Sequence, residues 1–135
     1  YPATFSPWKQ QSSIAYLGDK LLCVGTVQPD GEDELKKCIE CGVKVEIGYF
    51  PPEKIREYYR RAKRVIIPAV HGSERTVLEA MSMDILPLVK EEQKNFKAYS
   101  YILEYKNSEY ITPRDFILHF YSHKKYAQNL LKIYE

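Results

Sequence analysis

Four short apolar runs at regular spacing constrain the fold of this chain more than any other feature. They begin near residues 20, 43, 64 and 85, so each gap leaves room for one helix. Apolar residues dominate these runs, which predicts strands covered on both faces. Strands that alternate with helices predict a parallel sheet with right-handed crossovers. The fold class predicted from this pattern is α/β, a Rossmann-like three-layer sandwich with a mainly parallel sheet.

The pattern divides the chain into a predicted arm or linker, residues 1–19, and a domain over residues 20–135. The proline and glutamine–serine content of the first part is typical of a connecting segment, in which 14–17 could add a short strand. After the fourth strand the signals weaken: residues 99–105 fit a helix or a strand, and 108–112 fit a short edge strand. C-terminal helices are predicted over about 113–135, where Pro113 follows a capping Thr112.

Composition bounds the function classes. The 135 residues are enough for one domain with a core, and 44% apolar and 28% charged residues are typical of a globular protein. No apolar run approaches the ~20 residues that span a bilayer. A net charge of +2 makes no strong case for nucleic acid. Three cysteines without a secretory signal favour a cytoplasmic protein, with a peripheral position at a membrane as the alternative, and the missing initiator Met suggests a piece of a longer chain.

The stretch from residue 64 to 83 combines a strand, a tight turn and a helix N-terminus. A helix N-terminus beyond the carboxyl end of a parallel strand suits a phosphate. Ser73 is expected to cap this helix, and Arg75 and Glu79 share its outer side at i, i+4 spacing. These two residues fit a surface ion pair as well as a ligand site.

Metal and redox sites have weaker support. Cys38 and Cys41 close a predicted helix, where the helix dipole opposes a thiolate, so we interpret them as ordinary helix cysteines. His119 and His123 are four residues apart with no third ligand nearby. We therefore expect no metal and no cofactor.

The ordered series of motifs resembles a known family. The series runs Lys-Leu-Leu-Cys-Val-Gly at 20–25, Gly-Val-Lys-Val-Glu-Ile-Gly-Tyr-Phe-Pro-Pro-Glu at 42–53, Val-Ile-Ile-Pro-Ala at 65–69, Thr-Val-Leu-Glu-Ala-Met-Ser at 76–82 and Leu-Pro-Leu-Val at 86–89. This is similar to the C-terminal, nucleotide-sugar-binding domain of two-domain GT-B glycosyltransferases, in the retaining, glycogen-synthase-like group 1 or family four branch. The resemblance covers roughly residues 20 to 90 and implies one half of a GT-B fold.

The resemblance implies roles for individual residues. Glu79 stands where that family holds the donor's ribose hydroxyls, and Tyr49 or Phe50 where the backbone meets the base. His71 and Arg75 are the implied catalytic residues, acting on the sugar and the leaving diphosphate. The turn and following backbone N–H groups that hold the diphosphate and sugar correspond to Gly72, Ser73, Glu74, Thr76 and Val77.

The sequence departs from the family pattern at three places. His71 replaces a glutamate eight positions before Glu79, and Glu74 is displaced from it by three places. Residues 90–93, Lys-Glu-Glu-Gln, replace a glycine pair. The family's first strand, with its basic phosphate-binding residue, is absent or reduced to residues 1–19.

These considerations predict a glycosyltransferase, or its donor-binding half, that transfers a sugar from a nucleoside diphosphate sugar to an unknown glycan, lipid or protein acceptor, with an acceptor-binding N-terminal domain missing. No nucleic-acid partner is expected. The alternative is a non-catalytic α/β binding or regulatory module that docks an acidic partner through the basic face of residues 56–64.

Overall fold

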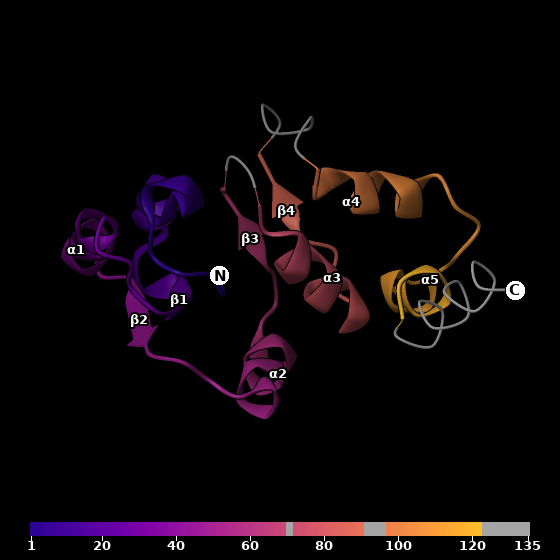
Figure 1. The fold of residues 1–135 in the computed structure, drawn as a ribbon, viewed down its shortest axis with the longest axis horizontal. Helices are drawn as coiled ribbons and strands as arrows, with labels where there is room; N and C mark the ends of the chain where they lie inside the picture. The colour runs from indigo at the N-terminus through magenta and orange to yellow at the C-terminus, as the bar shows by residue number, and fades with distance from the viewer. Residues whose placement is uncertain (70–71, 91–96, 123–135) are drawn as a thin grey trace, which may run out of the picture.

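A computed structural model describes residues 1–69, 72–90 and 97–122 of the chain. Its elements alternate between strand and helix as the spacing of the apolar runs predicts, which confirms the α/β class (Figure 1). In order they are η1 (Pro7–Lys9), η2 (Gln11–Lys20), β1 (Leu22–Gly25), α1 (Glu32–Glu40), β2 (Lys44–Ile47), α2 (Pro52–Arg61), β3 (Ile66–Ile67), α3 (Glu74–Ser82), β4 (Leu88–Val89), α4 (Tyr99–Lys106) and α5 (Pro113–Phe120).

The strands pair in parallel, but within the described residues they form two pairs rather than one continuous sheet. β1 lies beside β2 with Leu22 opposite Lys44, and β3 lies beside β4 with Ile66 opposite Leu88. Both pairs are parallel, as a βαβ chain requires. β3 and β4 have two residues each, fewer than the apolar motifs at 65–69 and 86–89, and Val70 lies outside the described residues.

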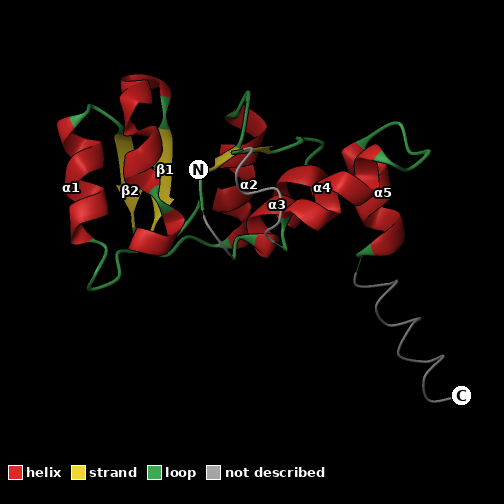
Figure 2. Ribbon diagram, turned by 90° about the horizontal axis from the view of Figure 1, so that it is seen from above, coloured by secondary structure: helices red, strands yellow, loops and turns green. Residues whose placement is uncertain are grey.

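Two helical segments, η2 and α1, lie side by side against the β1–β2 pair (Figure 2). α1 begins with three acidic residues and is followed by Gly42 at φ +82, as expected for a left-handed residue just beyond a helix. Cys38 is fully buried beneath it, whereas Ile39 is 55% exposed. The helical spacing had placed Ile39 inward with Cys38, but the next residue along a helix is rotated by about 100°, and this rotation carries Ile39 to the surface.

Residues 1–19 do not form an arm outside the packed unit. Tyr1 to Phe5 run parallel to β1: the Ala3 N–H donates to Val24 O at 2.9 Å and the Phe5 N–H donates to Thr26 O at 2.7 Å. The segment lies between β1 and the half of the molecule that contains β3 and β4 (Figure 1). It makes two isolated parallel bridges, Pro2 with Val24 of β1 and Phe5 with Val27, so the segment extends the β1–β2 pair at its edge. Residues 14–17 are helical rather than a short strand.

The described residues beyond β4 form two helices, α4 and α5. α3 packs against α4 and α5. The sequence left residues 99–105 open between helix and strand, and α4 is a helix there, whereas 108–112 form no strand. α5 begins as predicted: Pro113 occupies its first turn and Thr112 Oγ1 accepts from the Asp115 N–H at 3.2 Å. The last predicted helix, near 124–134, lies outside the described residues.

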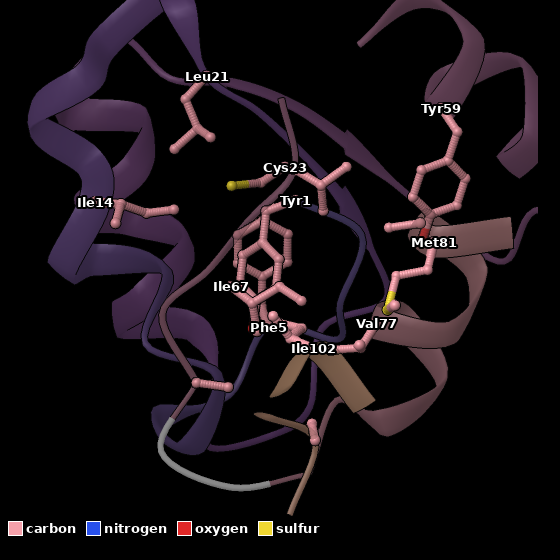
Figure 3. Close-up of a cluster of buried hydrophobic side chains, with 14 of the residues drawn as sticks. Tyr1, Phe5, Ile14, Leu21, Cys23, Tyr59, Ile67, Val77, Met81 and Ile102 are labelled. Atoms are coloured by element: carbon pink, nitrogen blue, oxygen red, sulfur yellow. The ribbon is translucent and has the colours of Figure 1, made fainter. Parts of the chain in front are cut away.

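One core joins the two halves. Figure 3 shows Tyr1, Phe5 and Ile67 between Ile14 of η2 on one side and Val77 of α3 on the other. Phe5 and Ile67 are both fully buried. The N-terminal segment therefore fills the space between the two strand pairs.

β2 departs from the expectation that every strand is covered on both faces. Lys44, Glu46 and Ile47 are exposed, and Ile47 is 52% exposed. β2 therefore has open surface that the sequence pattern predicted to be covered. None of the described helices has the length and apolar character needed to cross a membrane.

Candidate functional site

The N-terminus of α3 follows two residues in the left-handed region. Gly72 has φ +78 and Ser73 has φ +63. In this conformation the Ser73 side chain caps no helix N–H, so the prediction of a serine cap is wrong. The Ser73 hydroxyl instead accepts from Lys9 Nζ at 3.1 Å. The first-turn N–H groups of a helix have no intrahelical acceptor, so this end of α3 presents donors together with a lysine.

Lys9 is a candidate functional residue that sequence reasoning missed. It lies in η1, 64 residues before Ser73, and only the pairing of residues 1–5 with β1 brings it to α3. Burial lowers the pKa of Lys9, and the nearby Glu74 carboxylate partly offsets this. A β-carbon at Gly72 would lie 2.9 Å from Lys9 Nζ, so glycine lets the amine approach this turn. The signal that could have identified Lys9 from the sequence is a basic residue a few positions after the short extended segment at residues 1–5.

Glu79 is held by hydrogen bonds to both of its carboxylate oxygens. Arg75 Nε donates to Oε1 at 2.8 Å, and Tyr59 Oη donates to Oε2 at 3.1 Å. Burial and the Glu79 carboxylate raise the pKa of Tyr59, so its hydroxyl remains a donor at neutral pH. The Glu79 side chain is 34% exposed and the Arg75 side chain 86%. The carboxylate is thus fixed in orientation while still open to solvent.

These side chains border a cleft of about 460 Å³ beyond the carboxyl ends of β1 and β2. One wall is the N-terminal segment with the strand ends, and the other is formed by α2 and α3. Ligands of open α/β sheets bind at this edge. Its lining residues that bear on ligand binding are Thr26, Phe50, Tyr59, Arg75, Thr76 and Glu79.

Phe50 and Tyr49 occupy the cleft wall that follows β2. Tyr49 is 91% exposed, and the Phe50 ring meets the Tyr58 ring edge-on with centroids 6.0 Å apart. An exposed tyrosine beside a partly packed phenylalanine offers two aromatic surfaces at the cleft entrance. Planar rings of a ligand stack on such surfaces.

Apart from the buried Val77, the predicted site residues fall into three groups. Phe50, Arg75, Thr76 and Glu79 line the cleft together. Gly72, Ser73 and Glu74 lie at the start of α3 beside Lys9 rather than in the cleft lining. His71 lies outside the described residues.

Val77 and Thr76 are already engaged within the protein. The Val77 side chain is fully buried and its N–H donates to Ser73 O at 3.0 Å, so the prediction of Val77 as a binding residue does not fit. The Thr76 hydroxyl donates to Pro2 O at 3.2 Å. To bind a ligand, the Thr76 hydroxyl would have to give up its hydrogen bond to Pro2 O.

The basic face predicted over residues 56–64 is divided in the structure. Arg56 lines the cleft, and Arg60 forms an ion pair with Glu57. Arg61, Lys63 and Arg64 line a different cavity. The residues therefore do not act as one continuous helix face.

In the described parts of the chain, no group of three or more His, Cys, Asp or Glu side chains is arranged so that it could hold a metal ion. Cys23 and Cys38 are buried free thiols. Their mutual hydrogen bond lowers the pKa of Cys23 and raises that of Cys38. His119 contacts the rings of Tyr110 and Phe120, and His123 lies outside the described residues.

Comparison with known proteins identifies a structural relative. No protein-family profile matches the sequence, and no curated protein matches it. The catalytic domain of cholesterol-alpha-glucosyltransferase from Helicobacter pylori matches the structure with a TM-score of 0.61 and 19% identity, over 75% of this chain and 68% of that chain. The chain has a GT-B-like domain fold.

Proposed function

We propose that this chain binds the nucleotide-sugar donor of a glycosyltransferase in the cleft beside Glu79. The observation that carries the proposal is the Glu79 carboxylate, fixed by Tyr59 and Arg75 and open to the cleft. A carboxylate that is held but still accessible is a strong acceptor for the two hydroxyls of a ribose. The fold shared with a glucosyltransferase catalytic domain supports the same class of reaction.

The diphosphate belongs at the N-terminus of α3 in this proposal. The first-turn N–H groups and Lys9 present positive charge there, and Arg75 is the second residue of the helix. The base would then lie toward Phe50 and Tyr49, beyond the end of β2. Glu79, as the ribose ligand, would lie between the diphosphate end and the base end of the site.

The proposed reaction breaks the bond between the sugar's anomeric carbon and the phosphate oxygen. The electron pair goes to the leaving diphosphate, and the acceptor's hydroxyl oxygen bonds to the anomeric carbon and releases its proton. Lys9, Arg75 and the helix N–H groups stabilise the charge that develops on the diphosphate. The resemblance favours retention of configuration, with His71 near the sugar and the acceptor supplied through a second domain.

Calorimetric titration with UDP, GDP and their sugars tests the proposal. We expect binding that Glu79→Ala weakens by at least about tenfold, because the ribose loses a charged acceptor. Glu57→Ala is the matched control, since Glu57 is an exposed glutamate on α2 that pairs only with Arg60 among the described residues. Absence of binding at millimolar nucleotide, or equal affinity in the two variants, would reject the site.

A further inference from the structure

A second cavity adjoins the donor cleft along α2. Its volume is about 570 Å³, within the range of small-molecule sites. Its walls come from η2, β1, β2, α2 and β3, and about half of the lining residues are aliphatic, including Leu17, Leu22, Ile55 and Ile66. Its boundary with the donor cleft includes Ile55 and Tyr59, which line both.

The lining of this cavity is strongly basic. Three elements and the segment after α2 contribute five cationic side chains, and one acidic side chain, Asp19, stands against them. None of the five forms an ion pair with another described residue. The five are Lys20, Lys44, Arg61, Lys63 and Arg64. Positive charge that no acidic side chain neutralises favours an anionic ligand.

A hydroxyl without a partner lies in the wall. Tyr58 Oη is buried and forms no hydrogen bond within the described residues. A buried polar group without a partner costs folding free energy, so such groups are uncommon unless something binds them. This hydroxyl therefore marks a place for a polar atom of a ligand among the aliphatic side chains.

We propose that this cavity binds an anionic lipid of a membrane surface. The acyl portion would occupy the aliphatic interior, an ester oxygen would meet Tyr58 Oη, and the phosphate would lie among Lys63, Arg64 and their basic neighbours. A lining that combines aliphatic and cationic side chains matches an amphiphile better than a nucleic acid, which requires a groove with stacked bases. The site is separate from the donor cleft and does not depend on the proposed sugar transfer.

Vesicle sedimentation tests the charge requirement. The purified chain should bind vesicles of equal parts phosphatidylcholine and phosphatidylglycerol, and bind phosphatidylcholine alone much less. Reversing two charges in Lys63→Glu/Arg64→Glu should weaken binding on the order of a hundredfold. Arg60→Glu, on α2 and outside the cavity lining, is the control and should have a much smaller effect.

Two further variants test the cavity rather than the charge. Ala62→Phe places a ring in the cavity without changing the charge, and should weaken binding to the mixed vesicles. Tyr58→Phe should leave the unfolding free energy unchanged or higher, yet weaken vesicle binding by about three- to tenfold. Thermal unfolding of each variant separates loss of the site from loss of the fold.

Three results would overturn the proposal. Equal binding to neutral and anionic vesicles would show that the basic side chains do not contribute to lipid binding. Loss of binding only in the charge variants, with Ala62→Phe and Tyr58→Phe unaffected, would exclude acyl insertion. Binding of polyglutamate with the same dependence on Lys63 and Arg64, and none to vesicles, would identify a docking surface for an acidic protein instead.

Discussion

At the residue scale, Tyr59 is the side chain through which Glu79 is positioned. Its hydroxyl donates to Glu79 Oε2 at 3.1 Å, and its ring is almost completely buried. Tyr59 lies on α2, 20 residues before Glu79, so this contact joins two helices across the cleft. The i, i+4 pair of Arg75 and Glu79 could be read from helical spacing, whereas the tyrosine could not.

Removing the Tyr59 hydroxyl should impair nucleotide binding without removing the carboxylate. We expect Tyr59→Phe to lower the affinity for the bound nucleoside diphosphate by about three- to thirtyfold, because one charged hydrogen bond is lost. Calorimetry measures this. Tyr58→Phe, one residue away and without a hydrogen-bond partner among the described residues, should bind nucleotide as the unchanged protein does. Equal affinities for all three proteins would remove Tyr59 from the site.

The Tyr59 hydroxyl also predicts that the unfolding free energy of the protein falls at alkaline pH. Burial and Glu79 raise the pKa of Tyr59 above the ordinary value near 10, so the folded state holds the proton more tightly than the unfolded state. The contribution to stability is therefore complete below about pH 10 and is lost as the pH rises further, by at most about 1.4 kcal/mol per pH unit.

Urea unfolding between pH 8 and about 11 measures this loss. Tyr59→Phe should flatten the fall in unfolding free energy without abolishing it, because burial also raises the pKa of Tyr1 and Tyr121. An identical slope in Tyr59→Phe would contradict the assignment.

At the element scale, the turn before α3 decides whether Lys9 reaches the helix N-terminus. Gly72 combines a left-handed φ of +78 with close approach of Lys9 Nζ, whereas Gly42 after α1 has a similar φ of +82 and open space where a β-carbon would lie. The two glycines have the same backbone requirement and differ in their surroundings. They therefore form a matched pair.

Substitution by alanine should separate the two effects. Gly72→Ala and Gly42→Ala should each lower the unfolding free energy by about 1–2 kcal/mol, because a β-carbon disfavours the left-handed region. Only Gly72→Ala should also weaken nucleoside diphosphate binding, since the new methyl group displaces Lys9. Chemical denaturation and calorimetry on both variants measure the two quantities. Equal loss of binding in both would show that it follows from destabilisation alone.

The α5 helix shows that some helix boundaries are determined by residues close in the sequence. Its start follows from Thr112 and Pro113, which act within one turn. The start of α3 does not follow from its serine, because Ser73 adopts a left-handed conformation and accepts from Lys9. A capping residue thus predicts a helix start only where no distant side chain competes for it.

At the scale of the whole molecule, the first five residues join its two halves. They pair with β1, and Phe5 is fully buried in the shared core (Figure 3). Thr76 of α3 donates to Pro2 O, so the same segment also contacts the cleft wall. The strand pairs are thereby held in one unit.

Truncation of Phe5 should therefore destabilise the whole protein. We expect Phe5→Ala to lower the unfolding free energy by about 3–5 kcal/mol, because a fully buried ring leaves a cavity between the halves. Tyr16→Ala, which removes an aromatic ring that is 80% exposed, is the control and should change it by less than about 0.5 kcal/mol. Urea denaturation compares them, and similar losses in the two variants would place Phe5 outside the core.

The sequence by itself determined the alternation of strands and helices, the place of α3 after β3, and the Arg75–Glu79 pair. Apolar runs, capping residues and helical spacing act over a few residues, so they can be read along the chain. Only the tertiary structure decided that residues 1–5 pair with β1, that Lys9 meets Ser73, and that Tyr59 donates to Glu79. These contacts join residues 20 or more positions apart, and their geometry depends on how the core packs rather than on local sequence pattern.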